Sequence, residues 1–358
     1  MSKVHVIAMD THSQTTDICV KTRANGPGKR YRVKTTIPAL VEVIESVRRP
    51  RELVLEEGPL ADWLLRNLGS HVDQSMSCDP RKNALIAKDG DKDDAIDASK
   101  LCDLHLGGFT RGVHHAQSLQ RVVCKQAVGL YHERVRHRVA QANKVMGLLK
   151  RWGIMVREKD FADPKDREKL LAALGRGAEA QVAAGHVRLL WRSYDAAVVV
   201  EEQLRREVTK LAKQQEVVVR WQAVPGIKWI RGITLLAYLD TPWRFKSKRK
   251  LWKYVGIGLT REHSGSGFTR VHVDRGANRV LKNTLLGAAE TVIMKQRGEL
   301  YRRYERWLEA GQTYKNARRN LARDIATICW AMWKQGGDFD ERLIGGMPVC
   351  GQTEGGGL

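Results

Sequence analysis

The order of apolar segments in the first 80 residues constrains the fold of this chain more than any other feature. Alternating apolar and polar residues indicate strands, and the Asn25–Gly28 stretch favours a turn between two of them. The expected elements are strands over 4–10, 16–21 and 30–35, a helix over 38–48, a strand over 53–58, a helix over 59–68 and a strand over 72–77. This order predicts an α/β domain with a mixed sheet.

Carboxylates stand where two of these strands end. Asp10 follows the first apolar run, and Glu56 and Glu57 follow the fourth. Asp94 and Asp97 are three residues apart at the start of an expected helix, so they share one face of it. Such acids can converge where open α/β folds bind ligands, and their repulsion favours a hard divalent cation such as Mg²⁺ between them. The alternative is that Asp93 or Asp94 is an N-cap and the other acids complement the helix dipole.

The charge of the chain indicates a polyanionic partner. It has 62 Lys and Arg against 40 Asp and Glu, a net charge of +22 and a pI near 9.9, which favours nucleic acid. We expect no membrane segment, because no apolar run reaches transmembrane length, and we expect a cytoplasmic protein. The six cysteines form no Cys-x-x-Cys pair and are predicted to be reduced thiols.

The element order and the acids together resemble a known family. Lys-Asp-Asp at 92–94 with Asp97-Ala98 resembles the Lys-x-Asp-x-x-Asp-Ala signature of DEDD transposases, which include the Piv invertase and the insertion-sequence one-ten elements. The resemblance implies a RuvC-like, RNase-H-like domain over 1–116. It also implies a site for Mg²⁺, with Mn²⁺ as a substitute, whose ligands are Asp10, Glu56, Asp94 and Asp97. Glu57 stays an alternative, since the family usually has Glu-x-Thr-Gly where this chain has Glu-Glu-Gly-Pro.

Residues 117–217 read as a long-helix arm. Apolar stripes predict helices over 117–152 and 186–215, and these form either a coiled coil or a packed hairpin. Four histidines in or near this arm are interpreted as surface or nucleic-acid contacts rather than metal ligands, because no acid or cysteine accompanies them at ligand spacing. They are His114, His115, His132 and His137.

Residues 218–340 are expected to form a mainly helical domain that contacts nucleic acid. The Val224–Ile227 turn resembles a helix-hairpin-helix, although an ordinary helical turn explains it as well. In the run 244–253, six basic residues alternate with Phe245 and Trp252, which favours phosphate and base contacts. The expected nucleic-acid-binding residues are Arg244, Lys246, Lys248, Arg249, Lys250, Lys253, Arg275, Arg279, Arg318, Arg319 and Arg323.

A serine loop in this domain strengthens the resemblance. Glycines flank Ser264 and Ser266, and an Arg-Gly-Ala-Asn segment follows. This is similar to the family's C-terminal transposase domain, where a Ser-Gly pair precedes a Gly-Asn helix and the serine is the nucleophile. Ser264 precedes Gly276 by twelve residues, close to the family interval, so Ser264 is favoured over Ser266. A helix over 314–334 closes the domain, and a disordered tail is expected over 341–358.

The resemblance therefore implies a DNA transposase or recombinase that forms a phosphoserine–DNA intermediate. Family members act as oligomers, here a dimer or a tetramer, and a structured (bridge) RNA from the element guides them to donor and target DNA. The implied location is the prokaryotic cytoplasm, at the nucleoid during action. Two alternatives are a RuvC-like junction nuclease that activates water and a non-catalytic nucleic-acid-binding protein.

Overall fold

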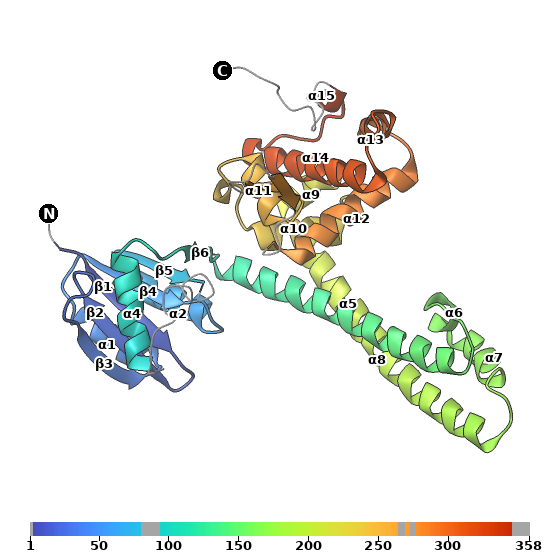
Figure 1. The fold of residues 1–358 in the computed structure, drawn as a ribbon, viewed down its shortest axis with the longest axis horizontal. Coiled ribbons are helices and arrows are strands. Elements are labelled where there is room, and N and C mark those ends of the chain that lie inside the picture. The colour runs from blue at the N-terminus through green and yellow to red at the C-terminus, as the bar shows by residue number, and fades with distance from the viewer. Residues whose placement is uncertain (1–2, 80–93, 117, 264–268, 273–276, 346–358) are drawn as a thin grey trace. The chain divides into compact units, whose positions relative to one another are not determined.

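The chain divides into two compact units in a computed structural model. The structure describes residues 3–79, 94–116, 118–263, 269–272 and 277–345. The first unit spans Met1–Ser118 and the second Leu119–Leu358 (Figure 1). Within the described residues, no helix is long and apolar enough to cross a membrane.

The first unit is built on a mixed sheet with the strand order β3-β2-β1-β4-β5-β6. Its strands are β1 (His5–Thr11), β2 (Thr15–Lys21), β3 (Lys29–Lys34), β4 (Arg51–Glu56), β5 (Gln74–Cys78) and β6 (Gly112–Val113). β1 pairs parallel with β4 and antiparallel with β2, and β4 pairs parallel with β5. The predicted mixed α/β order is confirmed, while the short β6 was not predicted.

Helices cover both faces of this sheet. α1 (Ile37–Glu45) and α2 (Ala61–Leu68) pack on the face that holds Ile7 and Met9 of β1. α4 (Asp94–Leu106) packs on the face that holds Val6 and Ala8. Because successive side chains of a strand point to opposite faces, Asp10 shares the α4 face with Val6 and Ala8.

The second unit begins with a helical hairpin. α5 (Leu119–Arg151) and α8 (Ala178–Lys213) run side by side (Figure 1). The short elements α6 (Lys159–Ala162), η2 (Pro164–Asp166) and α7 (Arg167–Ala172) lie between them in the chain and help to bury Phe161 and Trp191. The two long helices were predicted, but α8 begins at Ala178 rather than at residue 186.

The rest of the second unit is mainly helical, as predicted. Its elements are α9 (Glu216–Trp221), α10 (Trp229–Leu239), η3 (Pro242–Arg244), α11 (Lys248–Tyr254), β7 (Thr260–His263), β8 (Thr269–His272), α12 (Arg279–Lys295), α13 (Glu299–Glu309), α14 (Tyr314–Gln335) and α15 (Arg342–Gly345). They share one apolar core with the ends of α5 and α8 that carry Cys124, Val128, Val208 and Ala212.

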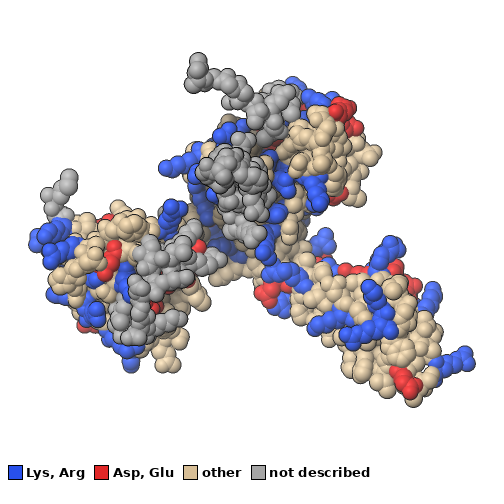
Figure 2. Space-filling model, in the orientation of Figure 1, with Lys and Arg blue, Asp and Glu red and all other residues tan. Residues whose placement is uncertain are grey.

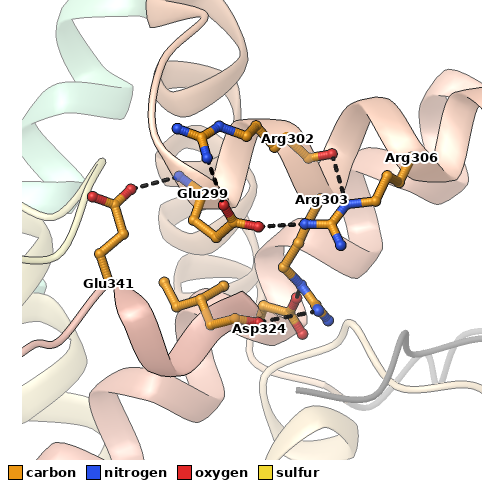
Figure 3. Close-up of polar contacts among 7 residues, drawn as sticks. Glu299, Arg302, Arg303, Arg306, Asp324 and Glu341 are labelled. Carbon is orange, nitrogen blue, oxygen red and sulfur yellow. Dashed lines mark hydrogen bonds and ion pairs between the residues drawn. The ribbon is translucent and has the colours of Figure 1, made fainter. Parts of the chain in front are cut away.

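A polar cluster fastens the last described segment to this core (Figure 3). Arg303 of α13 donates from Nε to Asp324 Oδ2 of α14 at 2.8 Å, and only 2% of Arg303 is exposed. The Glu341 carboxylate accepts the backbone N–H of Glu299, and Ile344 is buried. Residues up to Ile344 therefore pack on the domain, so the predicted start of the disordered tail at residue 341 is too early.

Candidate functional site

Asp10 and Glu56 meet at one edge of the first unit's sheet. The parallel register pairs Met9 with Leu55, so Asp10 and Glu56 follow side by side at the carboxyl ends of β1 and β4. Both lie on the face that α4 covers, because Ala8 and Val54 of the same strands pack against that helix. His12 Nε2 lies 3.4 Å from Asp10 Oδ2.

Asp97 brings a third carboxylate to this edge from the first turn of α4. Burial raises the pKa of Glu56, and the negative charges of Asp10 and Asp97 raise that pKa further. The three predicted acids are thus close enough to repel one another. Asp94 begins α4, but its side chain lies outside what the structure describes. Among the described side chains, no three His, Cys, Asp or Glu groups converge as a metal-binding set.

Asp17 is a further acid on the same face that the sequence analysis missed. It lies on β2 directly opposite Asp10, and only 4% of it is exposed. Its Oδ2 forms no hydrogen bond with a described residue, although Arg32 Nε of β3 lies 3.5 Å away. Asp17 and buried Cys19 are two residues apart in β2, so the alternation of the strand puts both on the same face. The sequence analysis considered only acids at strand ends and therefore missed this signal.

Glu57 is engaged in a separate polar network. Ser77 Oγ donates to Glu57 Oε2 at 2.7 Å, and His115 Nε2 lies 2.7 Å from the same oxygen. His115 Nδ1 also contacts Asp62 of α2. The interpretation of His115 as a surface or nucleic-acid contact is therefore wrong, because its ring is largely buried between two carboxylates.

His132 is likewise an internal residue rather than a surface contact. Its Nε2 lies 2.9 Å from Thr234 Oγ1 of α10, and burial lowers its pKa. His132 thus ties α5 to α10 inside the second unit. A neutral imidazole suits that position, since burial disfavours its charged form.

Some residues of the predicted nucleic-acid interface serve the fold of the second unit instead. Arg323 is buried and donates to Ile257 O and Asn320 Oδ1, both at 2.8 Å. Arg244 stacks 4.3 Å above the Tyr254 ring, and Phe245 is buried. The structure corrects these assignments, because a guanidinium bonded inside the domain and a buried ring cannot meet a phosphate or a base at the surface.

Other residues of that interface do reach solvent. The exposed cations are Lys246, Lys248, Arg249, Lys250, Lys253 and Arg279. On the same domain, Arg318 lies 3.2 Å from Glu290, and Arg319 donates to Asn316. Arg275 lies outside the described residues. Lys and Arg are also more abundant than Asp and Glu over the face drawn in Figure 2.

The Pro-Gly turn before α10 packs against a helix. Gly226 has φ +83, and a Cβ there would lie 2.4 Å from Ala288 O of α12. Ile227 is fully buried, and Arg231 donates to Gly226 O. This close helix–turn contact is a sufficient reason for the glycine, so the ordinary helical turn explains the sequence better than a phosphate-binding hairpin.

Ser264 and Ser266 lie outside the described residues, between two strands that are described. β7 and β8 pair antiparallel, with His263 opposite Thr269. The bond from Arg323 to Ile257 O holds the chain three residues before β7 begins. The predicted nucleophile therefore falls in the sequence between β7 and β8, and the chain that leads into β7 is bonded to α14.

Comparison with known proteins finds similarity to transposases. Residues 220–305 match the model of the IS116/IS110/IS902 transposase family. The chain is 25% identical over 255 residues to a candidate transposase, y4pF/y4sB, of Sinorhizobium fredii, covering 69% of this chain and 64% of that protein. It is 22% identical over 204 residues to the transposase of element IS1111A of Coxiella burnetii, covering 55% of each.

A third relative is an uncharacterised 43.6 kDa protein of insertion element IS110 from Streptomyces coelicolor, 27% identical over 129 residues, which cover 36% of this chain and 31% of that protein. The matches thus span 31% to 64% of the relatives' own lengths. Over residues 220–305 the chain is thus similar to the IS116/IS110/IS902 family of transposases, and the three relatives are proteins of insertion elements or transposases.

Proposed function

We propose that this protein is the transposase of a mobile element, a recombinase that cuts and rejoins DNA through a serine nucleophile. The family match over 220–305 carries the proposal, because that segment contains both Ser264 and the basic helix α11. The first unit would act as a RuvC-like domain, and its mixed sheet with acids at one edge is compatible with that role.

The proposed cofactor is Mg²⁺, or Mn²⁺, held by Asp10, Glu56, Asp94 and Asp97. Carboxylate oxygens suit such hard cations. Burial and then the charges of Asp10 and Asp97 raise the pKa of Glu56, and a cation would relieve that repulsion. Glu56 is a better ligand than Glu57, which Ser77 and His115 already engage. A bound cation would offset negative charge at the phosphate.

The proposed reaction is an exchange of phosphodiester bonds. A bond forms between Ser264 Oγ and phosphorus while one P–O bond of the DNA strand breaks, which leaves a phosphoserine–DNA linkage and a free DNA hydroxyl. The serine loses its hydroxyl proton, and the departing DNA oxygen gains one. Attack of a second DNA hydroxyl on the linkage restores Ser264 and rejoins DNA without an external energy source.

The proposed partners are donor and target DNA, a structured (bridge) RNA and further copies of the chain in a dimer or tetramer. The net charge of +22 supports a nucleic-acid partner of either kind. A prokaryotic cytoplasmic location at the nucleoid would follow from this role.

A junction nuclease is the second candidate, because the described acids that perturb Glu56 all belong to the first unit and need no serine from the second. Incubation with DNA and Mg²⁺ followed by denaturing electrophoresis tests both. Transposase chemistry predicts a protein–DNA adduct that survives denaturant, while a nuclease yields cut DNA with no adduct.

A further inference from the structure

Trp243 of η3 stands at the surface of the second unit beside Lys334, and a run of exposed cations follows it in the sequence. Its side chain is 71% exposed, the highest value among the tryptophans of the described residues. Lys334 Nζ of α14 lies 5.2 Å from the centre of the Trp243 ring and 4.0 Å from that of Trp330. We call Trp243, Lys334 and the exposed cations Lys246, Lys248, Arg249 and Lys250 the Trp243 platform.

The backbone that carries this exposed ring is held firmly. Trp330 Nε1 donates to Pro242 O at 2.8 Å, and Thr241 Oγ1 accepts the Trp243 N–H. On the other side, Arg244 donates to Tyr238 O at 3.2 Å and stacks on Tyr254. A large aromatic ring that is fixed at its base but uncovered can bind a flat partner with little loss of conformational entropy.

The charge around the ring selects the class of that partner. No Asp or Glu occurs between Asp240 and Glu262, while the platform cations fall within this stretch or face it from α14. An apolar protein surface would have to cover these charged side chains here. A nucleic acid offers both complementary features, phosphates for the cations and bases for the ring.

Stacking on the Trp243 ring requires a base with a free face, and this decides between single-stranded and double-stranded nucleic acid. Bases inside a duplex already stack on both faces, so an exposed side chain could reach them only by opening the stack, which costs energy. An unpaired base has a free face, and recognition of single-stranded loops commonly uses aromatic side chains in this way.

We propose that Trp243 is a stacking site for an unpaired base of single-stranded nucleic acid, whose phosphates lie along Lys246, Lys248, Arg249 and Lys250. The proposal deepens the proposed function, on whose nucleic-acid partner it rests, and it is independent of the serine chemistry. An RNA loop and a single DNA strand present the same chemistry, and the test below separates them.

The test measures binding by the full chain in EDTA, so that DNA cleavage plays no part. The probes are labelled oligouridine, oligothymidine and a DNA duplex of the same length. Trp243→Leu keeps an apolar side chain but removes the aromatic face, whereas Trp243→Phe keeps an aromatic face. Trp152→Leu, at a tryptophan with 39% exposure on the helical hairpin, is the matched control.

Trp243→Leu is expected to weaken binding of a single-stranded probe about 5- to 150-fold, the range for loss of one stacked base. Duplex affinity and the melting temperature should stay unchanged, Trp243→Phe should retain most of the affinity, and Trp152→Leu should match the wild type. A larger loss for oligouridine than for oligothymidine would identify RNA as the occupant, and the reverse would identify DNA.

Equal losses for duplex and single strands would overturn the proposal, as would a Phe variant as weak as the Leu variant. A change in oligomeric mass on Trp243→Leu, with nucleic-acid affinity intact, would assign the ring to a second copy of the chain instead. Failure of the proposed serine reaction would leave these binding results unchanged, so the two claims fail separately.

Discussion

Removing the charge of Asp324 should destabilise the second unit severely. Arg303 and Asp324 are 2% and 6% exposed, and Arg303 Nε lies 2.8 Å from Asp324 Oδ2. Asp324→Asn keeps the shape of the side chain but takes the carboxylate charge of Asp324 away from the buried Arg303 guanidinium. Breaking a buried pair in this way costs about 3–5 kcal/mol. For a unit of this size that corresponds to a fall in melting temperature of about 6–20 °C.

Differential scanning calorimetry measures this effect, with Asp340→Asn as the matched control. Asp340 pairs with Arg342 at 3.0 Å, but Arg342 is 91% exposed, so the control should melt like the wild type. The double variant Arg303→Met/Asp324→Leu should recover more than half of the loss, because no charge is then left buried. It should fall short of full recovery, since Arg303 also stacks on Trp307.

Two results would refute this reasoning. An Asp324→Asn variant that melts like the control would show that the ion pair makes no net contribution to stability. A double variant as unstable as the single one would show that lost packing, rather than an unpaired charge, is the cause. The same helix, α14, also carries Arg323, which donates to Ile257 O three residues before β7 begins.

Three further outcomes are expected. Asp10→Ala and Asp97→Ala should each abolish strand transfer in Mg²⁺ without lowering the melting temperature, because they remove ligands and repulsion rather than core; recombination at the wild-type rate would reject the metal site. Glu56→Gln should raise the melting temperature at pH 7 but not at pH 4. The pKa of Glu56 is raised in the folded state, so the stability that its protonated form contributes is fully present below the ordinary pKa of Glu and is lost as pH rises through the folded-state pKa. An equal gain in melting temperature at both pH values would contradict this. Neutralising Lys248 and Lys250 should flatten the plot of log affinity against log salt by about 0.7–0.9 per lost phosphate contact, and an unchanged slope would assign both to solvation.

Local sequence pattern predicted the first unit well. Strand alternation located the ends of β1 and β4, and parallel pairing then brought Asp10 and Glu56 to one edge. The i, i+3 spacing placed Asp97 on the first turn of α4, and this helix packs on the sheet face that holds Val6, Ala8 and Val54. Asp17 escaped notice because it lies within a strand, where burial depends on which face α4 covers.

The second unit shows where sequence reasoning reaches its limit. A basic run does not reveal which of its residues turn inward, since this depends on contacts that are distant in the chain. Arg323 bonds to Ile257, and Phe245 packs beneath Arg244, whereas Trp243 is left at the surface. Composition predicted a nucleic-acid interface, but the packing of α10, α11 and α14 decides which of the predicted side chains reach solvent.

The covalent intermediate is the most direct test of the proposed recombinase. Wild-type protein, Ser264→Ala and Ser266→Ala are incubated with labelled element-end DNA, Mg²⁺ and the nucleic acid that copurifies with the protein, and adducts are mapped by mass spectrometry. The account predicts a DNA adduct on Ser264 that Ser264→Ala loses while it keeps DNA binding, and that Ser266→Ala keeps at least in part. An adduct mapped to another residue, or metal-dependent cleavage by the wild type with no adduct, would contradict it.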